Sequence, residues 1–234
     1  LIKPLTDLFT KDTGIKVNII TAKAAQLHQR ILREGDNSQA DVLLTSDAGN
    51  LWRAHNDKLL QSVSSDILDS KIDSKYKDPD NYWFGLSLRA RIVVYAADRV
   101  DKNKLLGYKS LANPEFKGRV LIRSSSNIYN QSLIAHMISK YGLVEAEKWA
   151  MGLVRNFARD PAGGDRDQVK ALAAGEGDIA IVNSYYVANM MDTDNKNLFD
   201  KLRIYFPNDD FMGTHLNISG AAVLKNAPNV NNAI

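Results

Sequence analysis

Short apolar segments alternate with segments of helical periodicity along this chain, and this alternation limits the folds open to it. Residues 41–45 and 178–182 are largely apolar runs of the kind that form buried strands, and residues 15–20 and 119–122 are short β-branched strands. Residues 22–34 carry apolar side chains at helical spacing. Strands separated by helices of this length indicate α/β layers with parallel strands.

Two long extended segments interrupt this series. Residues 82–95 are rich in strand-forming residues, with a break near residues 87–89. Residues 214–224 are extended again, and Ser219-Gly220 breaks them. Two α/β series joined by such segments predict two lobes connected by crossing strands.

We assign the lobes from this pattern. The N-terminal lobe is discontinuous and comprises residues 1–90 and 214–234, and the C-terminal lobe comprises residues 91–213. The chain opens on Leu1 without a Met, and residues 228–234 resemble a helix that stops after one turn. We therefore expect both ends of the N-terminal lobe to be truncated.

Composition excludes several classes of function. The 234 residues include no Cys, which removes thiolate nucleophiles, iron–sulfur clusters, zinc–thiolate sites and disulfides. The net charge of +3, from 30 basic and 27 acidic residues, does not indicate a nucleic-acid partner. No apolar run approaches the ~20 residues that span a bilayer. The four histidines have no i,i+4 partner and no G-x-S-x-G segment is present, so we expect no His-rich zinc site, no catalytic residue and no enzyme.

A pair of tyrosines follows one predicted strand. Residues 183–186, Asn-Ser-Tyr-Tyr, come directly after the strand at 178–182 and precede a predicted helix at 187–191. Ligands of open α/β sheets bind at the carboxyl ends of strands, so Tyr185 and Tyr186 would present two phenol oxygens to one crevice. The alternative is that the rings are packing residues with a tethered hydroxyl.

A polar segment follows a second strand. Residues 123–131, Arg-Ser-Ser-Ser-Asn-Ile-Tyr-Asn-Gln, open a helix after the strand at 119–122. Backbone N–H groups at a helix start, surrounded by hydroxyl side chains, form an anion site. The alternative is an ordinary N-cap made by Ser126 or Asn127. Tyr129, in the first turn, would point toward whatever lies above the strand end.

Two arginines lie two positions apart in the first extended segment. Arg89 and Arg91 would share one face of a strand, which is rare for like charges unless an anion or carboxylates meet them. The alternative is a solvated face or structural ion pairs. The loop at 161–165, Pro-Ala-Gly-Gly-Asp, precedes a predicted helix at 168–174. We predict a plain turn there, and the alternative is a loop that contacts a ligand.

Three tyrosines at two strand ends suit a hard trivalent cation. A phenol with an ordinary pKa of ~10 is protonated at neutral pH, but a strongly charged ion can displace the proton. Fe³⁺ matches phenolate oxygen, whereas softer divalent metals prefer His or Cys. Three phenolates would balance the charge of the ion and leave an arginine for a small anion.

With these residues in view, the chain resembles the periplasmic ferric-ion-binding proteins of bacterial ABC importers. The tyrosine pair is the most specific point of likeness. The other landmarks are Thr-Gly-Ile-Lys-Val at 13–17, Ala-Asp-Val-Leu-Leu-Thr at 40–45, Phe-Lys-Gly-Arg-Val at 116–120, the 123–131 segment and Gly-Thr-His-Leu-Asn-Ile-Ser-Gly-Ala at 213–221.

The resemblance implies roles for individual residues. Tyr185 and Tyr186 match the adjacent iron-ligating tyrosines, and Tyr129 matches the third tyrosine of the branch that uses three phenolates. Another branch has a Glu ligand where this chain has Ser46 and Asp47, so we favour the three-tyrosine branch and assign no ligand there. A further ligand of the family lies on a first strand before Leu1.

The same resemblance implies an anion beside the iron. Arg89 matches the arginine near the ion and its anion, which we expect to be one such as carbonate. Ser126, Asn127 and Ile128 match the helix-start segment that holds a phosphate in another branch.

The implied fold is α/β, of the two-lobed periplasmic-binding-protein type II, with two mixed sheets and a ligand cleft at a two-strand hinge. The hinge strands would be residues 91–95 and 216–221. The implied function is capture of Fe(III) in that cleft by a monomeric periplasmic protein and delivery to an inner-membrane ABC permease. The main alternative is a binder of a small organic anion or phosphate ester with the same fold. An esterase, or a regulatory effector domain with a DNA-binding region elsewhere, are further alternatives.

Overall fold

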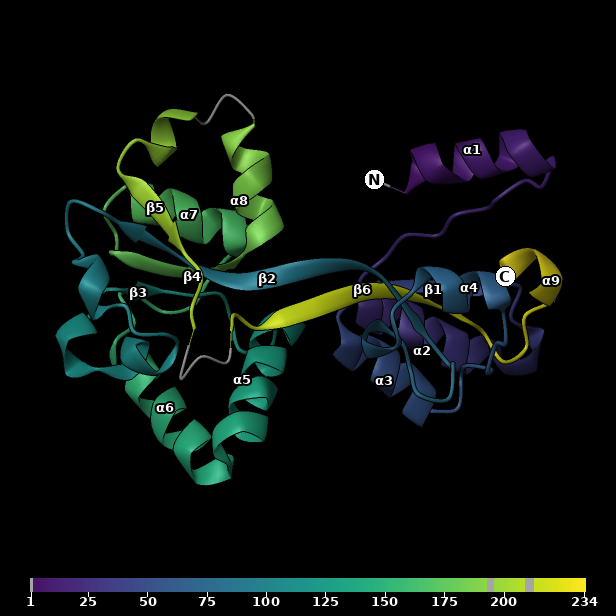
Figure 1. The fold of residues 1–234 in the computed structure, drawn as a ribbon, viewed down its shortest axis with the longest axis horizontal. Coiled ribbons are helices and arrows are strands. Elements are labelled where there is room, and N and C mark those ends of the chain that lie inside the picture. Colours follow the sequence, from purple (N-terminus) through teal and green to yellow (C-terminus); the bar gives the residue numbers. More distant parts are fainter. Residues whose placement is uncertain (1, 193–195, 209–212) are drawn as a thin grey trace. The chain divides into compact units, whose positions relative to one another are not determined.

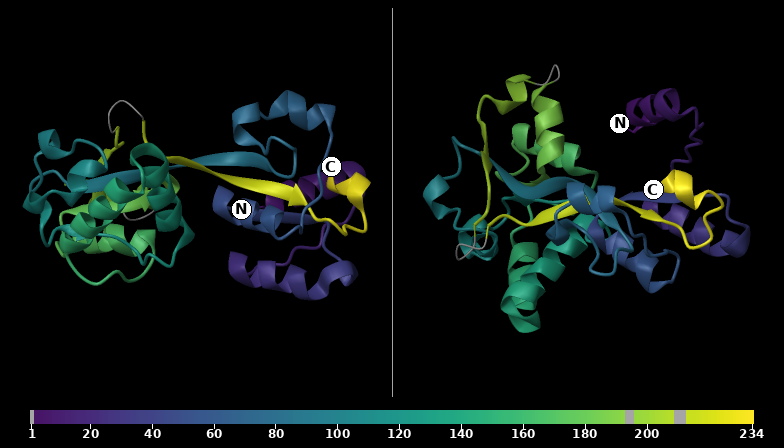
Figure 2. Two further views of the ribbon diagram at one scale, coloured as in Figure 1. Left: turned by 90° about the horizontal axis from the view of Figure 1, so that it is seen from below. Right: turned by 45° about the vertical axis from the view of Figure 1, so that its right-hand side comes forward.

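The computed structural model describes residues 2–192, 196–208 and 213–234 (Figures 1 and 2). The helices are α1 (Lys3–Thr13), α2 (Ala24–Glu34), α3 (Ala48–Asn56), α4 (Asp66–Lys71), α5 (Ile128–Tyr141), α6 (Leu143–Arg155), α7 (Asp165–Ala173), α8 (Ser184–Met191) and α9 (Val230–Ala233). The strands are β1 (Val42–Ser46), β2 (Phe84–Ala96), β3 (Val120–Leu121), β4 (Ile179–Asn183), β5 (Leu202–Tyr205) and β6 (Leu216–Val223).

The chain divides into two compact units. Unit 1 comprises Leu1–Leu86 and Ser219–Ile234, and unit 2 comprises Ser87–Ile218. Strands β2 and β6 each contribute to both units. The strands follow a single order, β1-β6-β2-β4-β3, with β5 beside β2, where two separate mixed sheets were expected.

Both parallel and antiparallel pairs occur. β3 and β4 are parallel, whereas β1 with β6 and β2 with β4 and β5 are antiparallel. The expectation of parallel layers therefore holds for the β3–β4 pair and not for these other pairs. That one parallel pair is the part of the sheet that positions the candidate site.

Unit 2 buries both faces of its sheet. Val93 and Ile181 pack with α5 and α6 on one face, and Ile92 and Val182 pack with α7 and α8 on the other. Figure 1 shows these two helix pairs on opposite sides of β4. Strands covered on both faces are apolar at every position, which explains the continuous apolar run of β4.

Several expected elements are corrected. Residues 15–20, expected as a strand, have no regular secondary structure and form no ladder with another described strand. The expected breaks near 87–89 and at Ser219-Gly220 do not occur, because β2 and β6 are continuous. In unit 1 a Cβ on Gly220 would lie 2.4 Å from the Phe84 carbonyl oxygen, so this glycine permits a close backbone approach and not a turn.

Unit 1 has a smaller core. β1 pairs with the end of β6, from Val42 opposite Val223 to Ser46 opposite Ser219. Val63, Phe84 and Val223 are buried together beneath α4 and α9. Asp47 is the N-cap of α3, and its carboxylate accepts a hydrogen bond from the Gly49 N–H.

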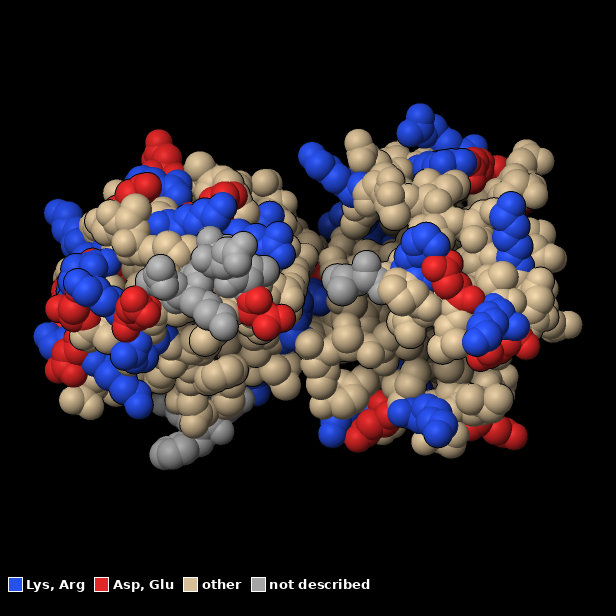
Figure 3. All heavy atoms as spheres, turned by 90° about the horizontal axis from the view of Figure 1, so that it is seen from above, with Lys and Arg blue, Asp and Glu red and all other residues tan. Residues whose placement is uncertain are grey.

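Charges are mixed over the surface. On the face in Figure 3, Lys and Arg are interspersed with Asp and Glu, which gives no single basic stripe on that face for a nucleic acid. Among the described residues, no helix combines the length and the apolar character needed to pass through a bilayer.

Candidate functional site

The tyrosines meet because two neighbouring parallel strands send their helices to opposite faces of the sheet. β3 is followed by residues 122–127 and α5, and β4 runs directly into α8. Figure 1 shows α5 and α8 on opposite sides of β4. The ends of such strands form a crevice where the chain direction diverges, which is where α/β sheets bind ligands. Tyr129, Tyr185 and Tyr186 all lie in the first turns of these two helices.

The three phenols form a cluster within unit 2. The Tyr129 and Tyr185 hydroxyl oxygens lie 3.4 Å apart. The rings of Tyr185 and Tyr186 lie 4.1 Å apart between centroids, at an interplanar angle of 34°. All three side chains are half-buried. The pair was expected in a loop before a helix at 187–191, but α8 begins at Ser184, so both tyrosines are helical.

Without a cation, the pKa values of Tyr185 and Tyr186 are raised above the ordinary value of a phenol. Burial raises the pKa of Tyr185, and hydrogen bonding with Tyr129 and Tyr186 raises it further. Burial also raises the pKa of Tyr186, helped by the nearby charge of Asp165. Both shifts arise chiefly because a phenolate in this place lacks solvation, which the nearby guanidiniums do not offset with counter-charge. A trivalent ion would supply that counter-charge and release the protons.

Three guanidinium groups face the tyrosine rings. The Arg89 and Arg123 guanidinium carbons lie 5.0 and 5.3 Å from the centroid of the Tyr129 ring. The Arg166 guanidinium lies 5.6 Å from the Tyr186 ring centroid. Arg89 is buried and donates a 2.6 Å hydrogen bond to the Ile218 carbonyl oxygen. The site therefore combines phenol hydroxyls with guanidinium cations that can hold an anion.

The expected anion segment at the start of α5 is largely satisfied by its own loop. The Ser126 N–H donates to Ser124 Oγ at 3.2 Å, and the Asn127 N–H donates to the Ser124 carbonyl oxygen. The Asn127 side chain caps the helix by accepting from the Tyr129 N–H at 3.0 Å. The Ile128 N–H has no hydrogen-bond partner among the described residues. The Ile128 N–H is thus a backbone donor at the helix start, next to Tyr129 in the chain.

Arg91 is buried in unit 2 and bonded to residues at the helix starts that carry the tyrosines. Its guanidinium contacts Asp165, Asn183 and Asn130. Asp165 is the carboxylate that meets Arg91, so the alternative of a structural ion pair is confirmed for Arg91, whereas Arg89 bonds the Ile218 carbonyl oxygen. The alternative of a solvated strand face for Arg89 and Arg91 is wrong, since both side chains are buried.

Sequence analysis missed part of this neighbourhood. Asp165 was placed in a plain turn, but it is the first residue of α7 and is almost fully buried. Arg123 and Arg166 received no role. The sequence did contain a signal for these residues. Asp165 follows a Gly-Gly pair and is followed by Arg166 at the start of a helix.

Other metal-ligand sets are absent from the described residues. No group of three or more His, Cys, Asp or Glu side chains in them could hold a metal ion. The rings of His136 and His215 lie 4.9 Å apart between centroids, but they have no carboxylate with them in such a group. Asp47, which we did not assign as a ligand, caps α3.

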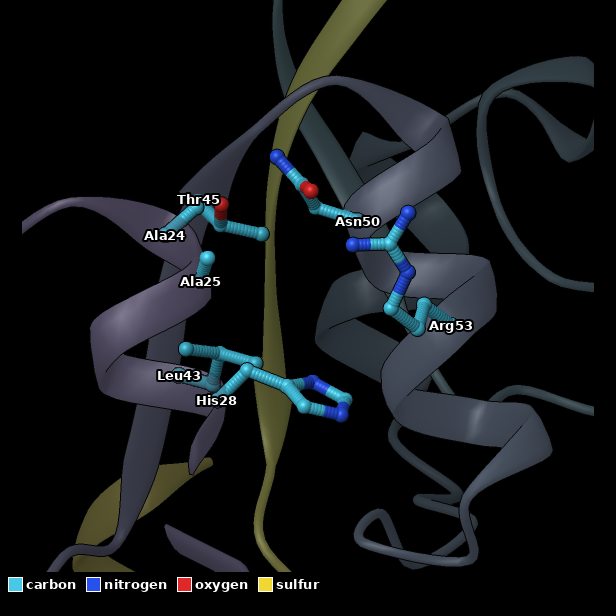
Figure 4. A pocket seen from close by; sticks show the side chains of 7 residues that line it. All are labelled: Ala24, Ala25, His28, Leu43, Thr45, Asn50 and Arg53. Carbon is cyan, nitrogen blue, oxygen red and sulfur yellow. The ribbon is translucent and has the colours of Figure 1, made fainter. Parts of the chain in front are cut away.

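Unit 1 contains a separate pocket. Figure 4 shows His28, Arg53, Asn50 and Thr45 around it, with Ala24 and Ala25 at the start of α2. The His28 ring bonds Asp57 Oδ2 at 2.7 Å, and the Asn50 amide donates to the Ser46 carbonyl oxygen at 2.7 Å. These polar groups already serve the packing of unit 1.

The strand ends of this α/β chain present phenols and guanidiniums, which is an arrangement suited to binding a ligand. The chain is a member of the bacterial extracellular solute-binding protein family, whose model matches residues 5–234. This membership confirms the expected class of extracytoplasmic solute-binding protein, as opposed to an enzyme. The chain has the α/β fold of periplasmic binding proteins, in agreement with its solved relatives.

Three relatives illustrate the likeness. The Iron uptake protein A1 of Synechocystis is 44% identical over 97% of this chain and 64% of its own length. A Trichodesmium protein solved in complex with iron and citrate ligands is 49% identical, with a TM-score of 0.93, covering 99% of this chain and 74% of that one. The ferric binding protein from Campylobacter jejuni is 40% identical, with a TM-score of 0.93, covering 99% and 74%. The chain thus spans 64% of the length of the Synechocystis relative.

Proposed function

We propose that this chain is the main part of a periplasmic protein that binds Fe(III) through Tyr129, Tyr185 and Tyr186. The observation that carries the proposal is the convergence of the three phenols at the ends of β3 and β4, with two hydroxyl oxygens 3.4 Å apart. A hard octahedral cation with metal–oxygen distances of ~2.1 Å brings adjacent ligand oxygens to about 3 Å. A closure of a few tenths of an ångström between Tyr129 and Tyr185 would suffice. The iron-binding relatives support the same cargo.

Charge favours a trivalent ion over a divalent one. Three phenolates cancel three positive charges, and the buried Arg91–Asp165 pair is neutral as a unit. A divalent ion would leave the charge of one phenolate to the nearby guanidiniums, in a half-buried place where the phenolate is already disfavoured. Phenolate oxygen is also a poor match for softer divalent metals.

An anion completes the proposed site. Arg89 and the Ile128 N–H are the donors best placed for it, and Ser126 and Asn127 shape the loop beside them. A small anion such as carbonate would add charge-assisted hydrogen bonds with the guanidinium. The Trichodesmium relative was solved with iron and citrate ligands, so citrate is a second anion to compare with carbonate by experiment.

The wider role follows from the family. We infer that the complete protein is a monomer that delivers the ion to an inner-membrane ABC permease. Strands β2 and β6, which contribute to both units, are the hinge strands of the proposed two-lobed type II arrangement. Closure over the ion and reopening at the permease would then control capture and release.

Equilibrium dialysis against ferric nitrilotriacetate, with and without bicarbonate, tests the proposal. We expect one iron per protein in the wild type and a loss of bound iron in the Tyr185→Phe/Tyr186→Phe double variant. Full retention of iron by the double variant would show that the phenols are not the ligands. No binding by the folded wild type, together with binding of citrate or phosphate alone, would favour the organic-anion alternative.

A further inference from the structure

The Arg91 guanidinium lies at the centre of a buried network in unit 2. Its side chain is 2% exposed. Nη1 donates to Asp165 Oδ2 at 2.7 Å and to Asn183 Oδ1 at 3.2 Å, and Nη2 donates to Asn130 Oδ1 at 2.6 Å. One planar group thus holds three partners in a fixed geometry.

Each partner marks the start of a helix at the candidate site. Asn130 follows Tyr129 in the first turn of α5, and Asn183 is the N-cap of α8, two residues before Tyr185. Asp165 is the first residue of α7, and its Oδ2 also accepts a hydrogen bond from the Asn183 N–H at 2.8 Å. The three helix starts are therefore bonded to one side chain.

The network extends to the loop of the proposed anion. The Asn130 amide donates to the Arg123 and Ser124 carbonyl oxygens at 2.7 and 3.2 Å. Arg91 itself is fixed by the sheet, since it pairs with Asn183 in the β2–β4 ladder. The spacing between α5 and α8 therefore depends on Arg91, a residue of β2, and β2 carries no tyrosine of the cluster.

We propose that Arg91 is the positioning residue of the tyrosine site. Its guanidinium group bonds the starts of α5, α7 and α8 together and so sets the distance between the Tyr129 and Tyr185 hydroxyls. This inference rests on the proposed function. Positioning acts on the cargo through the tyrosines, because misplacing a ligand oxygen by an ångström removes much of its contribution to the site.

The ion pair between Arg119 and Asp178 illustrates a purely structural role for an arginine. In the same unit, Arg119 Nε donates to Asp178 Oδ2 at 2.6 Å and Nη2 donates to the Arg99 carbonyl oxygen at 2.6 Å. These contacts join β3 to its neighbouring loops and include none of the three helix starts. Arg119 therefore serves as the control for replacing a hydrogen-bonded guanidinium group elsewhere in the same unit.

The test compares Arg91→Lys with Arg119→Lys. Lysine keeps the positive charge beside Asp165 but cannot bond Asp165, Asn183 and Asn130 at once. For Arg91→Lys we expect at least a tenfold loss of affinity for ferric nitrilotriacetate. We also expect the absorbance of the iron–phenolate band per bound iron to fall toward that of Tyr129→Phe. Arg119→Lys should lower the melting temperature while keeping the wild-type affinity and band.

A double-mutant cycle makes the outcome decisive. If Arg91 acts through Tyr129, then Tyr129→Phe should cost less affinity in the Arg91→Lys background than in the wild type. Additive effects, or an Arg91→Lys band and affinity equal to those of the wild type, would overturn the inference. If Arg91→Lys does not fold, Asn130→Ala, which keeps the Arg91–Asp165 pair, replaces it in the same cycle. Absence of a band in the wild type would instead contradict the proposed function.

Discussion

The hydroxyl oxygens of Tyr129 and Tyr185 lie 3.4 Å apart although 56 positions separate the residues in the chain. Their proximity follows from the parallel pairing of β3 and β4, whose ends lie at the same edge of the sheet. Tyr186 stacks beside Tyr185, so one edge of unit 2 presents three phenols. Phenolate oxygens suit a hard cation, and the guanidiniums beside the rings suit its anion, which is the basis of the proposed iron site.

Removing single phenol oxygens should weaken iron binding in steps. Tyr129→Phe, Tyr185→Phe and Tyr186→Phe each keep the ring and delete one ligand, so we expect affinity for Fe(III) to fall by orders of magnitude for each. Competition with a chelator of known affinity measures the losses. Tyr205→Phe is the matched control, since its hydroxyl accepts a hydrogen bond from the Gly107 N–H and lies outside the cluster. A loss of only a few fold, as for one neutral hydrogen bond of ~0.5–1.5 kcal/mol, would contradict ligation.

Iron binding should release protons and strengthen as pH rises. Burial raises the pKa of Tyr185 and of Tyr186, so both phenols are protonated in the iron-free protein at neutral pH. Binding of the ion must then displace about three protons, one from each phenol. Proton release into weakly buffered solution, measured with a pH indicator during iron titration, checks the number. Release near zero after correction for the chelate would show that the tyrosines remain protonated.

Binding of the anion should depend on Arg89 more than on Ser126. Arg89→Gln removes the cation beside Tyr129 and with it a charge-assisted hydrogen bond to the anion. Because such a bond contributes ~1.5–3 kcal/mol, we expect a roughly 10- to 150-fold loss of iron affinity in bicarbonate. Ser126→Ala should cost only a few fold, because the Ser126 N–H and hydroxyl already bond Ser124. Isothermal titration at several bicarbonate concentrations distinguishes the two. Equal bicarbonate dependence in Arg89→Gln and the wild type would remove Arg89 from the anion site.

The stability of the protein should fall on acidification through His215. Burial, with smaller contributions from His136, Arg91 and Arg89, lowers the pKa of His215 to about 3, below the ordinary value of 6.5. Between these values the unfolded chain binds a proton that the folded chain does not, so the free energy of unfolding decreases as pH falls from about 6.5 toward 3. The decrease from one such group is at most about 1.4 kcal/mol per pH unit. Urea unfolding of the wild type and His215→Gln at pH 7, 5.5 and 4.5 measures it, and identical slopes would exclude His215 as the cause.

The sequence locates β4 and the start of α5 in unit 2, because local signals mark these elements, whereas α7 and α8 begin three residues before their predicted starts. The apolar run at 179–182 and the Asn127 cap mark β4 and the start of α5 without tertiary information. The strand expected at 15–20 is wrong for the opposite reason. A β-branched run becomes a strand only when a partner offers hydrogen bonds, and the described structure gives residues 15–20 none.

The candidate site was predictable in its residues and not in its geometry. Position after a strand drew attention to Tyr129, Tyr185 and Tyr186, but the sequence does not show that β3 and β4 are neighbours. The support beneath them is entirely non-local: Arg91 and Asp165 are 74 positions apart, and neither belongs to a motif with Asn130 or Asn183. Long-range polar networks of this kind leave no periodic signal in a single sequence.

The most direct test of the account is a visible absorption spectrum recorded while the purified protein is titrated with ferric nitrilotriacetate in bicarbonate. Tyrosine ligation predicts a broad phenolate-to-iron charge-transfer band that grows to one equivalent, then stays constant, and is lost in the Tyr185→Phe/Tyr186→Phe variant. A folded protein that shows no such band at any iron concentration would contradict the central claim that the three phenols bind Fe(III).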